Sequence, residues 1–364
     1  MNEDSLAFLK RLLAAPSPSG YEERATAIIA EYLPRNIEAT YDRLGTLSAL
    51  LRGEDSRHKV MLMAHADEVG LTVRYIDENG FVWFSHIGGV DYRGLPGKKV
   101  TIHGRNGDVP GVVGLKPVHL CTPEERRTLP PPEELFIDIG AASREEAAAA
   151  VAVGDPASFD SSVTHLLGGR IASRGLDDKS GCFVLAEVLT RLAQSGEKPP
   201  YDILGIFTAQ EEIGLRGATV AAHSAEASIG ICIEADICSD YPGIDRRKYG
   251  EMGVARGPIL PRSPAVDRTL FRYLSSVAER EGITVQVTDL VHPDETEVSE
   301  MQISREGVAT ALVMIPLRYM HSTAEVVSLA DMENAIGLLT AALAGMRSAP
   351  QIEALVNAST RPAR

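Results

Sequence analysis

The chain has 364 residues, of which 44% are hydrophobic, so it can build a large core and is not globally disordered. Its formal net charge of -14 opposes binding to nucleic acid and to anionic membrane surfaces, so we expect neither as a partner. The N-terminus lacks the features of a signal peptide, and the four cysteines are scattered without zinc-knuckle spacing, which together predict a cytoplasmic protein with reduced thiols.

The first part of the chain is predicted to form two helices followed by two strands. Residues 5–13 and 22–32 have helical periodicity and are separated by a breaker that contains proline and glycine. Residues 46–51 and 59–64 are expected to form strands. The second of these is almost continuously apolar, which is typical of a strand covered on both faces.

Residues 71–160 differ in composition and predict a small β-rich insertion. Residues 71–76 and 81–87 flank an Asp-Glu-Asn-Gly turn and are expected to form a hairpin. Short strands rich in glycine and proline follow. Next come a charged, proline-rich loop over residues 121–134 and an alanine-rich helix over residues 144–151.

Strands and helices alternate again after the insertion. The expected elements are helices 180–192 and 330–346 and strands 203–208, 228–233, 284–290 and 310–314. This alternation favours an α/β fold with a mainly parallel central sheet and helices on both faces. We therefore expect one domain built from residues 1–70 and 161–364, interrupted by the insertion.

Five short segments place acids or histidines at strand ends or helix starts, where α/β sheets form their binding crevices. His65 follows an apolar strand, and Asp67 would accept a hydrogen bond from the ring nitrogen that is not bound to a metal. The alternative for His65 is an ordinary histidine at a strand end. Asp177 precedes a helix and would bridge two metals, whereas Asp178 is equally well explained as a helix N-cap.

The other three segments follow apolar strands. Glu211 and Glu212 are adjacent, so their side chains diverge and one can face a metal while the other faces a water. Glu234 leaves the next strand, with Asp236 as a competing candidate, and His321 follows another. Each segment alone has an ordinary surface explanation. Together the five indicate a metal site.

Two histidines and three carboxylates suit a pair of divalent ions, with zinc or cobalt expected. Such a pair acidifies a water and polarises a substrate carbonyl. A nearby carboxylate that binds no metal then carries the proton of the water to the leaving amine. The chemistry indicated is therefore hydrolysis of an amide.

At these segments the sequence resembles the co-catalytic metallo-aminopeptidases of the glutamyl, deblocking and tetrahedral aminopeptidase family, some of which are labelled cellulases or endoglucanases. The resemblance runs from residues 18–22 (Pro-Ser-Gly-Tyr-Glu) through Ser322 into the last helix. It is most specific over residues 210–217 (Gln-Glu-Glu-Ile-Gly-Leu-Arg-Gly).

The resemblance implies an enzyme that removes N-terminal residues from short peptides with two metal ions per chain. It also implies an insertion that mediates dimerisation, often followed by assembly of dimers into dodecamers. The implied site consists of His65 and Glu234 on one metal, Glu212 and His321 on the other, Asp177 bridging them, Glu211 as general base, and Asp67 supporting His65.

The sequence departs from the family pattern at two places. Glu234 stands where the family usually has aspartate, and residues 294–297 read Asp-Glu-Thr-Glu where Gly-Gly-Thr-Asp is usual. If that loop approaches the substrate, its extra acids would favour a basic or amine group there.

Other functions remain open alternatives. A dinuclear carboxypeptidase or N-acyl amino-acid deacylase would share the same core, although no positive group can be assigned to hold a substrate carboxylate. A glycosidase would need two carboxylates flanking a sugar, and adjacent Glu211 and Glu212 do not fit that arrangement. An inactive oligomeric scaffold is disfavoured because every predicted position retains a chemically competent side chain.

Overall fold

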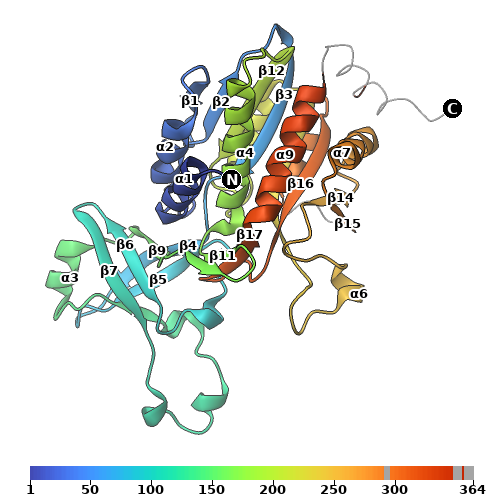
Figure 1. Ribbon diagram of the computed structural model, residues 1–364. Coiled ribbons are helices and arrows are strands. Elements are labelled where there is room, and N and C mark those ends of the chain that lie inside the picture. Colours follow the sequence, from blue (N-terminus) through green and yellow to red (C-terminus); the bar gives the residue numbers. More distant parts are fainter. Residues whose placement is uncertain (291–295, 347–354, 356–364) are drawn as a thin grey trace.

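A computed structural model describes residues 1–290, 296–346 and 355, and Figure 1 shows its architecture. Within these residues the main sheet has eight strands in the order β1-β2-β12-β3-β13-β16-β14-β15. Their bounds are β1 (Glu38–Tyr41), β2 (Leu47–Leu51), β3 (Asp55–His65), β12 (Tyr201–Thr208), β13 (Ile229–Ile237), β14 (Ile259–Arg262), β15 (Gln286–Asp289) and β16 (Ala309–Leu317).

The four central strands β12, β3, β13 and β16 are parallel to one another. The outer strands make the sheet mixed, because β2 runs antiparallel to β12 and β14 runs antiparallel to β16. The prediction of a mainly parallel sheet is therefore confirmed for the four central strands, and the sheet as a whole is mixed. A short connection between β1 and β2 permits antiparallel pairing there, whereas parallel neighbours need long crossovers.

Alternate residues of β3 belong to two hydrophobic cores on opposite faces of the sheet. Val60 and Leu62 pack in a core with α1 (Glu3–Ala14), α4 (Leu176–Gln194), α7 (Arg268–Glu281) and α9 (Leu329–Gly345). Met61 and Met63 pack on the other face with α5 (Arg216–Ala225) and α8 (Glu297–Gln302). The expected helices on both faces are thus present, and α2 (Glu23–Tyr32) lies beside α1 (Figure 1). Among the described residues, no helix is both long and apolar enough to span a membrane.

A separate closed barrel follows β3 along the chain. Its strand order is β4-β5-β8-β7-β6-β9, and it encloses a hydrophobic core of its own. The elements are β4 (Gly70–Ile76), β5 (Val82–Ile87), β6 (Lys99–Gly104), β7 (Gly107–Gly114), β8 (Phe136–Asp138), β9 (Pro156–Phe159) and α3 (Arg144–Ala150). The predicted hairpin corresponds to β4 and β5. In Figure 1 the barrel lies to one side of the sheet, and the segment between β7 and β8 extends away from it.

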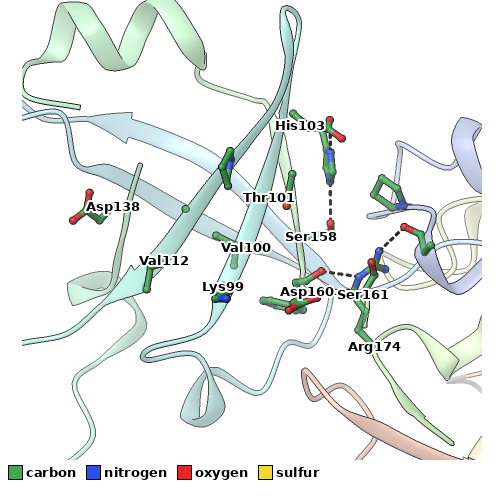
Figure 2. A pocket seen from close by; sticks show the side chains of 16 residues that line it. Lys99, Val100, Thr101, His103, Val112, Asp138, Ser158, Asp160, Ser161 and Arg174 are labelled. Carbon is green, nitrogen blue, oxygen red and sulfur yellow. Dashed lines mark hydrogen bonds and ion pairs between the residues drawn. The ribbon is translucent and has the colours of Figure 1, made fainter. Parts of the chain in front are cut away.

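Smaller elements complete the described structure. A three-stranded sheet joins β10 (Thr164–Leu166), β11 (Arg170–Ser173) and β17 (Glu325–Ser328). A cavity of about 590 Å³ lies where barrel strands meet residues near the end of α1, and Figure 2 shows side chains that line it. On its wall the two ring nitrogens of His103 contact Asp108 and Ser158, and Arg174 donates a hydrogen bond to the carbonyl of Phe159. Arg174 thus ties the barrel to the start of α4.

A buried cluster of three charges lies where the barrel and the main sheet meet. The Glu68 carboxylate contacts Arg174 and lies 3.0 Å from Lys179 Nζ, and all three residues are at most 2% exposed. Lys179 also donates to the carbonyl of Ala15 at 2.6 Å. Gly175 has a φ of 61°, and a Cβ there would collide with the Glu68 carboxylate, so the chain needs glycine at this position.

Burial alone would raise the pKa of Glu68, but the charges of Arg174 and Lys179 outweigh it and leave the pKa lowered. Replacing Glu68 with Gln would leave two buried cations without their anion, so we expect the free energy of unfolding to fall by about 3–5 kcal/mol. A depressed carboxyl pKa contributes stability above its unfolded value, and that contribution is lost as the pH falls through the folded value. Urea unfolding at several pH values should therefore show the largest deficit near neutral pH. A deficit that grows on acidification would contradict this account.

Candidate active site

The predicted site residues converge at one edge of the main sheet. Because β3, β12, β13 and β16 are parallel, their carboxyl ends meet there. His65 ends β3, Glu211 follows β12, Glu234 lies on β13, and His321 follows β16. Asp177 comes from the start of α4, next to a cis peptide bond between Asp177 and Asp178.

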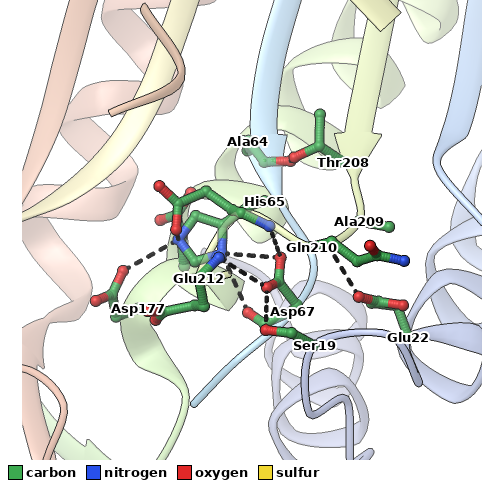
Figure 3. Close-up of polar contacts among 12 residues, drawn as sticks. Ser19, Glu22, Ala64, His65, Asp67, Asp177, Thr208, Ala209, Gln210 and Glu212 are labelled. Atoms are coloured by element: carbon green, nitrogen blue, oxygen red, sulfur yellow. Dashed lines mark hydrogen bonds and ion pairs between the residues drawn. The ribbon is translucent and has the colours of Figure 1, made fainter. Parts of the chain in front are cut away.

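His65 faces carboxylates on both sides of its ring. Its Nε2 atom lies 3.2 Å from Asp177 Oδ1, 3.3 Å from Glu234 Oε1 and 4.0 Å from Glu211 Oε2. Its Nδ1 atom lies 3.1 Å from the backbone carbonyl of Asp67 and 3.5 Å from the carboxylate of the same residue (Figure 3). The predicted contact with Asp67 is therefore present, but the carbonyl oxygen is the nearer acceptor.

His321 lies on the other side of Asp177. Its Nε2 atom is 3.3 Å from Asp177 Oδ2 and 3.3 Å from Glu212 Oε1. Its Nδ1 atom is 3.0 Å from the carbonyl oxygen of Gly89, which precedes η1 (Tyr92–Gly94) in the barrel segment. Asp177 thus directs one carboxylate oxygen toward each of the two histidines.

The cluster has the donor atoms that divalent cations require. His65, Asp177 and Glu212 offer ligand atoms within 4.8 Å of one another, as do His65, Asp178 and Glu234. Among the described residues, Glu234 Oε2 and Asp178 Oδ2 are buried without a hydrogen-bond partner. Buried carboxylate oxygens left in this state are stabilised by a cation. The residues therefore fit divalent-cation binding.

The structure bears on two alternatives that the sequence left open, the role of Asp178 and the choice between Glu234 and Asp236. Asp178 Oδ1 accepts the backbone N–H of Gly181 at 2.9 Å, which is the type of bond an N-cap aspartate makes, and its other oxygen borders the cluster. Asp236 Oδ1 accepts the N–H of Ile237 at 2.7 Å. Within the described part of the chain Glu234, and not Asp236, belongs to a group with metal-ligand spacing.

The predicted general base is held in a crowded, low-dielectric environment. Burial raises the pKa of Glu211, and although His65 opposes this, neighbouring carboxylates bring it to about 10. Those carboxylates include Glu234 and Glu212. A divalent cation beside Glu211 would lower this pKa through its opposite charge.

His321 responds to the same charges with the opposite sign. Burial lowers the pKa of its imidazole, but contacts with Asp177 and Glu212 outweigh burial and raise the pKa to about 11. Protonated His321 is therefore the form that these carboxylates favour when no metal is bound. A metal would compete with that proton for Nε2.

The carboxylate of Asp67 has a second set of partners that the sequence did not suggest. Its oxygens accept the backbone N–H groups of Glu211 at 3.0 Å and Glu212 at 3.1 Å, and the hydroxyl of Ser19 at 2.5 Å. Asp67 is fully buried. It therefore fixes the loop after β12 as well as lying beside His65.

Glu325, at the start of β17, supports the site and was missed by the sequence analysis. Its two oxygens accept the N–H of Asp177 at 3.1 Å and the N–H of His321 at 2.9 Å, and it is 1% exposed. The available signal was a lone acid beginning an apolar strand, without any informative spacing. Gly89 also borders the site, because a Cβ there would lie 3.0 Å from His321 Nδ1.

The acidic loop before α8 is only partly described. Residues 294 and 295, whose acids would favour a basic or amine group if the loop approaches the substrate, lie outside the described residues. Glu297 is fully buried and accepts a hydrogen bond from the hydroxyl of Thr208. The carboxyl group of Glu297 is therefore buried beside β12, and the preference of the loop for a basic or amine group stays a prediction.

Comparison with known proteins identifies the family. Residues 45–338 match the M42 glutamyl aminopeptidase family. A lysyl aminopeptidase from Pyrococcus furiosus is 33% identical over 339 residues, covering 92% of this chain and 95% of that protein. A glutamyl aminopeptidase from Lactococcus lactis is 25% identical over 350 residues, covering 93% of this chain and 96% of that protein.

Solved structures agree with these relatives. A TET aminopeptidase from a marine sediment archaeon of the Thaumarchaeota has a TM-score of 0.91 at 31% identity, covering 97% of this chain and 99% of that one. The TET1 peptidase of Pyrococcus horikoshii, described as assembling into a tetrahedron or a large octahedral shell, has a TM-score of 0.80 at 30% identity, covering 93% and 98%. The expectation of an enzyme is thus confirmed, and the chain belongs to the M42 glutamyl aminopeptidase family.

Proposed function

We propose that the protein is a metal-dependent aminopeptidase that hydrolyses N-terminal residues from short peptides with a water activated by two divalent ions. The observation that carries the proposal is the placement of Asp177, whose oxygens lie 3.2 Å from His65 and 3.3 Å from His321. A carboxylate between two imidazoles is the arrangement needed to bridge two cations.

The proposed ligands divide around that carboxylate. His65 and Glu234 would hold one ion and Glu212 and His321 the other, with zinc or cobalt suited to these nitrogen and oxygen donors. When bound, the ions would supply Lewis acidity toward a water and a substrate carbonyl.

Proton transfer is assigned to Glu211. Its Oε2 atom lies 4.0 Å from His65 Nε2, at the margin of the ligand cluster. A carboxylate there can take the proton of the attacking water and pass it to the leaving amine. Asp67 holds the backbone of Glu211 and so keeps its side chain directed at the site.

The barrel is the proposed dimerisation unit, with residues 71–160 as the inserted domain. Val118, Leu120 and Leu129 on the segment between β7 and β8 are 56%, 69% and 52% exposed, which supports a contact with another chain. A relative assembles into a tetrahedron, so a dimer and a dodecamer are both proposed here. Cytoplasmic location remains a prediction from the sequence.

The preferred N-terminal residue is open, since relatives are named for lysyl and for glutamyl residues. A carboxypeptidase or N-acyl amino-acid deacylase would use the same dinuclear core. The form of the substrate separates these functions: an aminopeptidase cuts peptides with a free N-terminus and leaves N-acetylated ones intact. An inactive scaffold would cut neither.

Glu211→Gln is expected to lower kcat for unblocked peptides by about 10²–10⁴-fold, because it removes general acid–base catalysis. The measurement is release of free amino acids from an unblocked peptide mixture, with metal content determined on the same samples. Metal content should match wild type. Full activity in Glu211→Gln, or cleavage confined to N-acetylated peptides or C-termini, would overturn the proposal.

Asp177→Asn is expected to reduce bound metal from about two ions per chain to one or none, since a neutral amide cannot bridge two cations. Elemental analysis after reconstitution with zinc or cobalt checks this. Glu234→Gln should also lose metal, whereas Asp236→Asn should retain it as the matched control. If Asp236→Asn loses metal and Glu234→Gln retains it, then Asp236 is the ligand and Glu234 is not.

A further inference from the structure

We infer that Glu22 is a positioning residue for the general base: its buried carboxyl group accepts the backbone N–H of Gln210 and fixes the turn that carries Glu211. The inference rests on the proposed function only in taking Glu211 as the base. Glu22 precedes α2 and lies far from Glu211 in sequence, and Figure 3 shows its side chain directed at Gln210.

The turn after β12 is held by side chains from three other segments. Four consecutive backbone N–H groups each donate to one of them. The bonds are Ala209 N to Thr46 Oγ1 (3.2 Å), Gln210 N to Glu22 Oε1 (3.0 Å), Glu211 N to Asp67 Oδ1 (3.0 Å) and Glu212 N to Asp67 Oδ2 (3.1 Å). These acceptors hold the turn together with backbone hydrogen bonds inside it, such as that from Gly217 N–H to the carbonyl of Ala209 at 2.9 Å.

Gln210 has an unfavourable backbone conformation in this turn. Its φ of 61° lies in the left-handed region, which residues other than glycine seldom occupy. Such a conformation persists when the surrounding structure holds it. Glu22 supplies that hold directly at the amide of Gln210, one residue before the proposed base.

The length of the Glu22 side chain, and not its charge, determines whether it can accept the N–H of Gln210. Glu22 is 3% exposed, and the same Oε1 atom also accepts the N–H of Gly20 at 2.6 Å. Burial and the charge of Asp67 raise the pKa of Glu22 to about 7 against the opposing backbone hydrogen bonds. Charged or neutral, the group keeps an oxygen that can accept from Gln210, so a glutamine would serve and an aspartate would be too short.

The residues beside Glu22 contact the barrel and supply a control. Tyr21 donates to the carbonyl of Gly154 at 2.9 Å, and Arg24 makes two hydrogen bonds to Asp108 at 2.8 and 2.9 Å. The ion pair between Arg24 and Asp108 is exposed and does not contact the turn after β12. Arg24→Gln therefore alters the same segment and keeps the hydrogen bond from the N–H of Gln210 to Glu22.

The test compares two variants. Glu22→Asp keeps an ionisable carboxyl group on a shorter side chain, and Glu22→Gln keeps the side-chain length without the carboxyl group. With unblocked peptides, Glu22→Asp should lower kcat about 10–100-fold, as expected of a displaced catalytic group, with KM and metal content near wild type. Glu22→Gln and Arg24→Gln should stay close to wild type. If Glu22→Gln is as slow as Glu22→Asp, or if both match wild type, the positioning role is overturned.

Hydrogen–deuterium exchange tests the same role without catalysis. Amides in peptides covering residues 209–217 should exchange faster in Glu22→Asp than in Glu22→Gln, with exchange elsewhere in the main sheet unchanged. Equal exchange in the two variants would overturn the inference even if kcat differs. If wild type cleaves no peptide, the proposed function fails, and the exchange comparison still decides whether Glu22 holds the turn.

Discussion

The carboxylate of Asp177 is the group around which the site is organised. One of its oxygens is directed toward His65 and the other toward His321, and these histidines come from strands that are not neighbours in the sheet. Bringing both imidazoles to one carboxylate requires the parallel arrangement of β3, β13 and β16, whose carboxyl ends share one edge. It also requires α4 to start at that edge. The order of strands in the centre of the sheet is therefore a condition for the chemistry.

Buried acids beyond the proposed ligands give the site its shape. Asp67, Glu325 and Glu22 each use carboxyl oxygens to accept backbone N–H groups of the loops that carry proposed functional side chains. A carboxylate can accept several such bonds at once, so one residue can hold two loop positions in register. The cost of burying it is offset by those bonds. The acidic character of the chain thus serves loop geometry as well as the proposed cation binding.

The sequence predicted the local parts of this structure better than the long-range ones. His65, Glu211 and Glu234 were identifiable because each leaves an apolar strand, and the resemblance over residues 210–217 led to the correct family. Glu325 and the closure of the barrel were not predictable, because both depend on pairing between distant segments, such as β9 with β4 and β6. The amphipathic helix α7 was overlooked, although its sequence has helical periodicity and an aspartate N-cap.

The contact between Gly89 and His321 has a consequence for how the two structural units relate. The carbonyl that lies 3.0 Å from the His321 ring belongs to the segment running between barrel strands, so the imidazole is oriented from outside the main sheet. The partner of a metal-binding histidine's second nitrogen fixes its tautomer and ring plane. The barrel therefore cannot be removed without affecting the site. A chain without it would keep every proposed ligand but would lose the Gly89 carbonyl oxygen that orients His321.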